Sequence, residues 1–185
     1  MRIKLIAATL LIVGMLGYSV ALPSFAAQNS ANQLSFVSAS GTQAELQPHN
    51  LCLRSASATQ TLSAEFAITA ETRAEGLMMR ETLAENAAML FVYDYTASRS
   101  FWMYRTLIPL DIAYINARGE ILDIQQMQPC RSYWSNRCPS YPAAAPFLYA
   151  LEVNLGKFAE WGVSVGDTLL ASDCETSIED AQPWR

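Results

Sequence analysis

The residues best suited to chemistry are two carboxylates set in apolar, strand-like sequence. Asp111 follows Pro109 at the end of the segment 101–111, FWMYRTLIPLD, and Glu152 interrupts the apolar run 147–154, FLYALEVN. A hydrolase that works with two carboxylates needs them on either side of a cleft, one of them with a raised pKa. Asp111 and Glu152 are the only pair that we would nominate as acid and base, so a carboxylate-dependent hydrolase is one hypothesis.

Arg80 is the cation that we expect to pair with Asp111. The two residues come from separate motif-like segments, and a guanidinium can hold a carboxylate through two hydrogen bonds. Such a pair either fixes a corner of the fold or belongs to a ligand-facing cluster bordered by Trp102 or Arg105. The sequence leaves both interpretations open.

Aromatic side chains favour a different function, which is binding without catalysis. An aromatic-lined face on a small β domain can hold a small molecule, a glycan or a peptide. Core and loop packing would explain the same side chains equally well. We nevertheless prefer a non-enzymatic binding module with an unknown small-molecule, glycan or peptide partner. The candidate ligand-binding residues are Arg80, Trp102, Arg105, Thr106, Asp111, Tyr141 and Glu152.

The first 26 residues have the layout of a secretory signal peptide. Arg2 and Lys4 precede an apolar run over 5–16, and the small residues Ser24 and Ala26 precede the expected cleavage site. The run is too short for an ordinary membrane span. We therefore expect an exported protein, periplasmic or extracellular. The remaining chain divides into a flexible leader at 27–44, a single β-rich domain at 45–175 and a polar tail at 176–185.

The charge of the chain argues against two classes of partner. The sequence has 12 basic and 17 acidic side chains, and loss of Arg2 and Lys4 leaves ten basic residues and a net charge of −7. Without a basic run, the mature chain is a poor candidate for binding nucleic acid or anionic lipid. We expect a monomer with no membrane span after cleavage.

Four cysteines in an exported chain favour two disulfides. Cys130 and Cys138 bracket a short loop, whereas Cys52 and Cys174 lie near the two ends of the domain. Of the three pairings that four cysteines allow, we predict 130–138 and 52–174.

Nucleophilic and metal chemistry have weaker support. With His49 as the only histidine and the cysteines oxidised, Ser-His-Asp and Cys-His sites lack a base or a thiolate. Thioethers suit Cu(I), so a Met-based copper protein is a second alternative function. Most of these methionines, however, sit in apolar runs typical of a core. They are Met78, Met79, Met89, Met103 and Met127. We expect no metal and no cofactor.

Short strands dominate the expected secondary structure. Residues 61–68 alternate between apolar and polar positions, and 88–93 form a short apolar run, as in a buried strand. Thr69 can cap a short helix. The segment 101–111 predicts a strand, a corner at Pro109 and a second strand, and 116–119 has the composition of a hairpin turn. With a long loop at 128–146, the pattern predicts a mainly β fold, a compact sandwich or barrel-like domain with one or two short helices.

Five motifs together resemble the domain of unknown function 192 family, over about residues 62–170. They are Gly76-Leu77-Met78-Met79-Arg80, Met89-Leu90-Phe91, Phe101-Trp102-Met103, Thr106-Leu107-Ile108-Pro109-Leu110-Asp111 and Leu151-Glu152-Val153. The resemblance implies a small β-rich domain, often exported, with no assigned activity. The chain departs from the family pattern at Tyr104-Arg105, Ala88 and Leu155, where the family commonly has Lys-Asn, Gly and Ala. Arg105 thus places a long cation where a short amide is usual.

Overall fold

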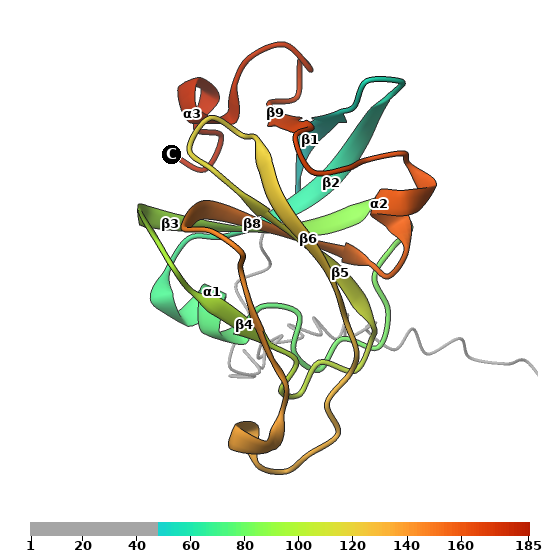
Figure 1. Ribbon diagram of the computed structural model, residues 1–185, viewed down its shortest axis with the longest axis vertical. Coiled ribbons are helices and arrows are strands. Elements are labelled where there is room, and N and C mark those ends of the chain that lie inside the picture. The colour runs from blue at the N-terminus through green and yellow to red at the C-terminus, as the bar shows by residue number, and fades with distance from the viewer. Residues whose placement is uncertain (1–47) are drawn as a thin grey trace, which may run out of the picture. The chain divides into compact units, whose positions relative to one another are not determined.

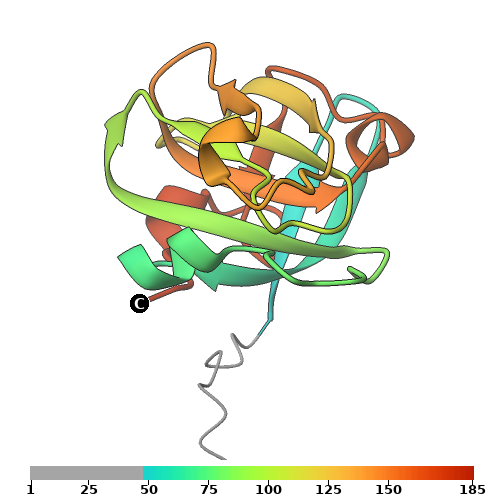
Figure 2. The same ribbon diagram turned by 90° about the horizontal axis from the view of Figure 1, so that it is seen from below.

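The computed structural model describes residues 48–185, which belong to one compact unit. The predicted signal peptide and leader lie outside the described residues. Within them, a seven-stranded sheet has the order β6-β5-β8-β3-β2-β1-β9 and curls into a half-barrel (Figures 1 and 2). Its strands are β1 (His49–Arg54), β2 (Thr59–Ala67), β3 (Ala87–Ala97), β5 (Leu110–Ile115), β6 (Ile121–Met127), β8 (Phe147–Asn154) and β9 (Thr168–Leu170). The prediction of a mainly β, barrel-like fold is confirmed.

Short elements complete the domain. They are α1 (Ala70–Glu75), α2 (Lys157–Glu160), α3 (Ile178–Ala181), a single 3₁₀ turn at Ser135–Arg137 (η1), and the two-stranded sheet of β4 (Ser100–Trp102) and β7 (Ser140–Pro142). Figure 1 shows the segment 128–146, in gold and orange, extending beyond one end of the large sheet. This segment was expected to be a loop, and pairing with β4 gives it the short strand β7.

The helix α1 begins where the sequence predicts. The Thr69 hydroxyl accepts the backbone N–H of Thr72, and the Thr72 hydroxyl accepts the N–H of Thr69, which closes a capping box. The helix lies in the crossover between β2 and β3, the one parallel pair in the large sheet. A parallel connection needs such a crossover, so the cap at Thr69 helps to set the topology.

The strand β1 is an inner strand of the large sheet although a proline, Pro48, directly precedes it. The strand starts at His49, directly after the proline, and it lies between β2 and β9. Because Pro48 stays outside the ladder, its missing N–H costs the sheet no hydrogen bond.

Successive residues of the central strands contribute to two different cores. The first core contains Leu90 and Leu151, and the second contains Met89 and Tyr114. This alternation follows from the period-two geometry of strands, which sends neighbouring side chains to opposite faces of the sheet. The face that a residue occupies therefore decides which core, and which site, it can join.

The C-terminal residues pack against the first core instead of forming the polar tail that we predicted for 176–185. Ser177 caps α3 by accepting the N–H of Asp180, and Ile178 is fully buried. The ring of Trp184 lies 5.4 Å from that of Tyr149, centroid to centroid. Two large apolar side chains in this short polar segment thus pack on the domain.

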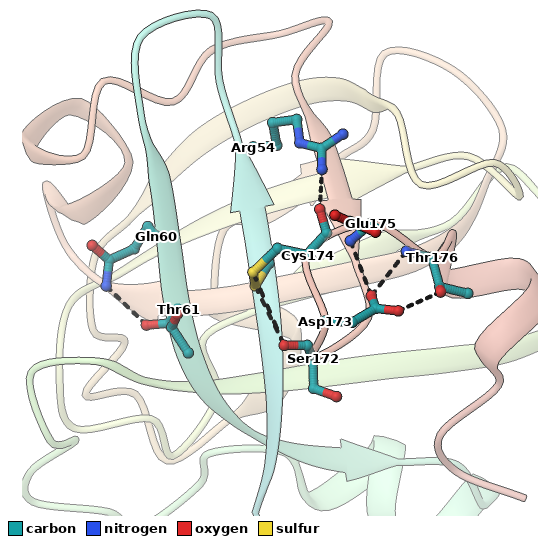
Figure 3. Close-up of a disulfide and its surroundings, with 9 residues drawn as sticks. Arg54, Gln60, Thr61, Ser172, Asp173, Cys174, Glu175 and Thr176 are labelled. Atoms are coloured by element: carbon teal, nitrogen blue, oxygen red, sulfur yellow. Dashed lines mark hydrogen bonds between the residues drawn. A yellow bond between two sulfur atoms is a disulfide. The ribbon is translucent and has the colours of Figure 1, made fainter.

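Both predicted disulfides are present. Cys52 on β1 is bonded to Cys174, with 5.2 Å between their Cα atoms, and Cys130 is bonded to Cys138, with 5.6 Å. Figure 3 shows the first crosslink, where Arg54 donates to the carbonyl of Cys174. Two disulfides indicate a non-cytoplasmic setting. None of the helices within residues 48–185 is both long and apolar enough to cross a membrane.

Candidate functional site

One row of side chains crosses the sheet and carries two glutamates. Glu65 on β2 is opposite Met89 on β3, Met89 is opposite Glu152 on β8, and Glu152 is opposite Ile112 on β5. Residues directly opposite one another in a sheet share a face. Glu65 and Glu152 therefore lie on the same face, on either side of Met89, which belongs to the second core.

Glu65 is paired with Arg80. The guanidinium donates from Nη1 and Nη2 to the two carboxylate oxygens at 2.5 and 2.6 Å, and the side chains are only 24% and 20% exposed. These hydrogen bonds raise the pKa of Arg80. The predicted pairing of Arg80 with Asp111 is wrong. The sequence shows that Arg80 needs a carboxylate, but strand order decides which one lies within reach.

We predict that Glu65 and Arg80 are energetically coupled. A double-mutant cycle with Glu65→Gln and Arg80→Met should give a coupling of about 1–3 kcal/mol in urea unfolding, because the two bonds are charge-assisted and half-buried. The exposed pair of Arg118 and Glu120, 3.8 Å apart, should couple more weakly. Equal coupling in both pairs would contradict the role given to burial.

Asp111 lies on the opposite face from Glu152. Asp111 is opposite Val153, one position along from the pair of Ile112 and Glu152, so the two carboxylates point to different sides of the sheet. Asp111 is buried, and its Oδ2 accepts the N–H of Gly156 at 2.9 Å. It therefore ties the start of β5 to the turn before α2. The two carboxylates share no cleft, which removes the geometry that a two-carboxylate hydrolase needs.

Glu152 is a buried carboxyl group that has no protein partner, and Oδ1 of the buried Asp111 has none either. Glu152 is 4% exposed, and none of the residues 48–185 donates a hydrogen bond to it. Burial alone raises its pKa from 4.5 to about 8, because an apolar environment disfavours the charged form. At neutral pH this carboxyl group is therefore mostly protonated in the unliganded protein. A cation bound beside it would lower its pKa and favour loss of the proton.

A pocket of about 90 Å³ opens onto Glu152. Thr106 is buried in its wall, whereas Trp102 is 49% exposed. The rest of the lining comes from α1 and the turn after it, from β3 and from β4: Arg73, Ala74, Glu75, Gly76, Leu77, Met78, Phe91, Tyr93, Ser100 and Phe101. Of the candidate residues, Trp102, Thr106 and Glu152 are brought together here.

Two residues of the helix end shape this pocket, and sequence reasoning missed both. Arg73 donates from Nη1 to the carbonyls of Ile68 and Val92 at 2.6 and 2.8 Å. Gly76 has φ +50°, and a Cβ there would come within 3.1 Å of the Phe91 ring. Arg73 is flanked by acidic residues and reads as an ordinary solvated helix charge, so no local signal marks it.

The other candidate residues lie outside the pocket. Arg105 lines a separate groove with Tyr104, and its carbonyl accepts the N–H of Met79 at 2.8 Å. The hydroxyl of Tyr141 accepts a hydrogen bond from the backbone N–H of Gln128. The backbone carbonyl of Tyr141 accepts one from the hydroxyl of Tyr114 at 2.6 Å. These bonds attach the crosslinked segment to the sheet, so the position of Tyr141 is explained by packing.

The methionines named for copper are dispersed between core and surface. Met89, Met103 and Met127 are buried in the second core, whereas Met79 is 63% exposed. Residues 48–185 contain no cluster of His, Cys, Asp and Glu suited to a metal ion. Three of the five methionines thus lie in one apolar core, where a Met side chain is ordinary packing.

Two solved structures are similar to this chain. A protein from Sinorhizobium meliloti 1021, described as a candidate transcription regulator, is 33% identical, with a TM-score of 0.61 over 66% of this chain and 92% of its own. A protein of unknown function from Novosphingobium aromaticivorans DSM 12444 is 30% identical, with a TM-score of 0.62 over 69% and 88%. No curated protein matches the sequence.

The match to a family profile covers most of the chain. The profile of domain of unknown function 192, described as "Uncharacterized ACR", matches residues 52–171, which run from the second half of β1 to β9 and include the pocket and the row from Glu65 to Ile112. The solved relatives share the fold over most of their length. The chain therefore belongs to the domain of unknown function 192 family.

Proposed function

We propose that the protein is an exported, non-enzymatic binding module whose pocket at Glu152 takes a small molecule or the end group of a glycan or peptide. The observation that carries this proposal is a buried carboxyl group that faces a pocket without a protein partner. The one fully enclosed side-chain oxygen without a hydrogen bond in residues 48–185 is Oδ1 of Asp111, so the oxygens of Glu152 are open to the pocket that this residue lines. A ligand that bonds to Glu152 would give this carboxyl group the partner that the protein does not supply.

The chemistry around the pocket supports binding more than catalysis. All cysteines of the described chain are in disulfides, and His49 is stacked on Phe66 at 4.7 Å. Phe66 belongs to the first core, whereas Glu152 faces the second. Asp111 lies on the other face of the sheet, so the pair of carboxylates nominated as acid and base is not assembled at the pocket, whose other lining carboxylate is Glu75.

The setting of the partner follows from the crosslinks and the charge. Two disulfides support export, and a net charge of −5 for the whole sequence disfavours nucleic acid. Although one relative is described as a candidate transcription regulator, we therefore propose a small-molecule, glycan or peptide partner for this chain.

We predict that Trp102→Ala abolishes ligand binding and leaves the fold intact. Trp102 is half exposed at the pocket, so its loss should lower affinity at least tenfold while the unliganded melting temperature changes little. The test is a thermal-shift screen of the oxidised protein with sugars, short peptides, cell-wall fragments and small amines, since binding to the native state raises its stability.

The matched control for this experiment is Trp134→Ala. Trp134 is 65% exposed in the crosslinked segment and does not line the pocket. A compound that stabilises the wild type should also stabilise this variant. Stabilisation that survives in Trp102→Ala but is lost in Trp134→Ala would move the binding site to the crosslinked segment.

A further inference from the structure

We propose that the ligand of this pocket carries an alkylammonium group, whose positive charge lies against the carboxylate of Glu152. The inference rests on the proposed binding function and adds the chemical class of the ligand. It depends on three features of the described residues. Glu152 has no hydrogen-bond partner in the protein, aromatic side chains line the pocket, and Nη1 of Arg73 is bonded to two backbone carbonyls instead of to Glu152.

The row across the sheet shows what a carboxylate on this face requires. Glu65 and Glu152 flank Met89 on one face. Glu65 receives the guanidinium of Arg80 through two hydrogen bonds. Glu152, which is more deeply buried, receives none and opens onto the pocket. A bound cation would supply to Glu152 what Arg80 supplies to Glu65.

The walls of the pocket suit the apolar part of an alkylammonium ion. Phe91, Phe101 and Trp102 line it, and cations are attracted to the faces of such rings at about 6 Å or less. The neighbouring Tyr93 already has the guanidinium carbons of Arg73 and Arg99 at 5.0 and 4.0 Å from its ring centre. A volume of about 90 Å³ accommodates a headgroup of a few heavy atoms.

The other charged and titratable groups near Glu152 are compatible with a bound cation. Arg73 and Glu75, both from α1, line the pocket with opposite charges. Nη1 of Arg73 is already bonded to two carbonyls. Burial raises the pKa values of Tyr93 on β3 and Tyr114 on β5, so both stay neutral at physiological pH. The raised pKa of about 8 makes Glu152 a group that changes charge near neutral pH.

Binding of a cation should therefore release a proton. The cation prefers the ionised carboxylate, and the unliganded protein ionises Glu152 only as the pH approaches about 8. Affinity should rise about tenfold per pH unit from pH 6 towards 8 and then level off, because each unit below the pKa leaves tenfold less carboxylate available. A ligand that accepts the proton of Glu152 would show the opposite trend.

The experiment compares three probes of nearly the same shape on the full oxidised chain. They are choline, its neutral analogue 3,3-dimethylbutan-1-ol and the anion 3,3-dimethylbutanoate, titrated by calorimetry at pH 6, 7 and 8. Choline should bind at least tenfold more tightly than either analogue. At pH 7 it should release close to one proton, measured from the heats in two buffers of different ionisation enthalpy.

Two variants complete the test. Glu152→Gln should lower choline affinity at least tenfold and abolish the pH dependence of that affinity. The control is Glu85→Gln, which replaces an exposed glutamate paired with Lys157 and should change neither the affinity nor its pH dependence. If the neutral or anionic probe binds as tightly as choline, or if affinity falls as the pH rises, the cation assignment is wrong and the binding pocket stands. If none of the probes binds and the screen of sugars, peptides and amines is also silent, both proposals fail.

Discussion

Removal of the Cys52–Cys174 disulfide should lower the free energy of unfolding by about 2–5 kcal/mol. The crosslink spans 122 residues, so its loss frees a long loop in the unfolded chain and raises the entropy of that state. The measurement is urea unfolding of a Cys52→Ala, Cys174→Ala double variant against the oxidised wild type at one pH. Each free energy must come from the midpoint and the slope of its own curve, and the slope should increase in the variant, because an unfolded chain without the crosslink is less compact.

The second disulfide provides a matched comparison. Cys130 and Cys138 are eight residues apart, so replacing both with alanine should lower the free energy of unfolding by only about 2–3 kcal/mol. It should also leave the large sheet intact, since the loop extends beyond one end of that sheet (Figure 1). If the short crosslink costs as much as the long one, loop length does not govern stability in this protein.

The long crosslink also has a local consequence for the C-terminal segment. It fastens β1 to the turn at Cys174 (Figure 3), and the chain then continues to the buried Ile178 and to Trp184, which packs on the first core. Without the crosslink, the segment is held by these two side chains and by the backbone contacts of 170–171 with Thr176 and Ser177. Hydrogen exchange in α3 should therefore increase more than exchange in β5 or β8.

The sequence predicts local structure well because its signals are local. Pro109 requires a corner and Asp111 follows it at the start of β5, as observed. Thr69 caps α1. The cysteine pairs follow from one short spacing and from two positions near the ends of the domain. Each of these predictions needs only the residues within a few positions or the distance between two cysteines.

The partners of charged residues could not be predicted, since they depend on strand order. A period-two pattern fixes which residues of one strand share a face, but it does not say which strand lies next to it. Arg80 reaches Glu65 because β2 and β3 pair in parallel. Asp111 and Glu152 are separated because the register of β5 and β8 places them on opposite faces. The second of these facts leaves Glu152 at the pocket without Asp111.

A pH-dependent loss of stability should mark Glu152 as the buried acid. Its pKa is raised from 4.5 to about 8 in the folded state, so between these values the native protein holds a proton that the unfolded chain has released. Stability is therefore greatest below about pH 4.5 as far as this group is concerned, and it falls as the pH rises. The expected slope is about −1.4 kcal/mol per pH unit up to about pH 8, where the curve flattens.

The substitution Glu152→Gln should remove this slope, because an amide of nearly the same shape cannot ionise. The variant should be more stable than the unliganded wild type by about 3 kcal/mol at pH 7 and about 4 kcal/mol at pH 8, as measured by urea unfolding at pH 5, 6, 7 and 8. Asp173 cannot imitate the effect. Hydrogen bonds, the largest from the Thr176 hydroxyl, lower its pKa to about 2, so its contribution changes only below about pH 4 and with the opposite sign.

The same experiment separates the energetic cost of Glu152 from its proposed function. If Glu152→Gln stabilises the protein at pH 8 and weakens binding of choline, the carboxyl group lowers native stability while serving a ligand, which is the pattern expected of a binding residue. Saturating choline should then restore part of the stability lost by the wild type at pH 8, because its charge replaces the missing partner. A wild-type curve that is flat from pH 5 to 8 would mean that Glu152 already has a partner, and the pocket would lose the group on which both proposals depend.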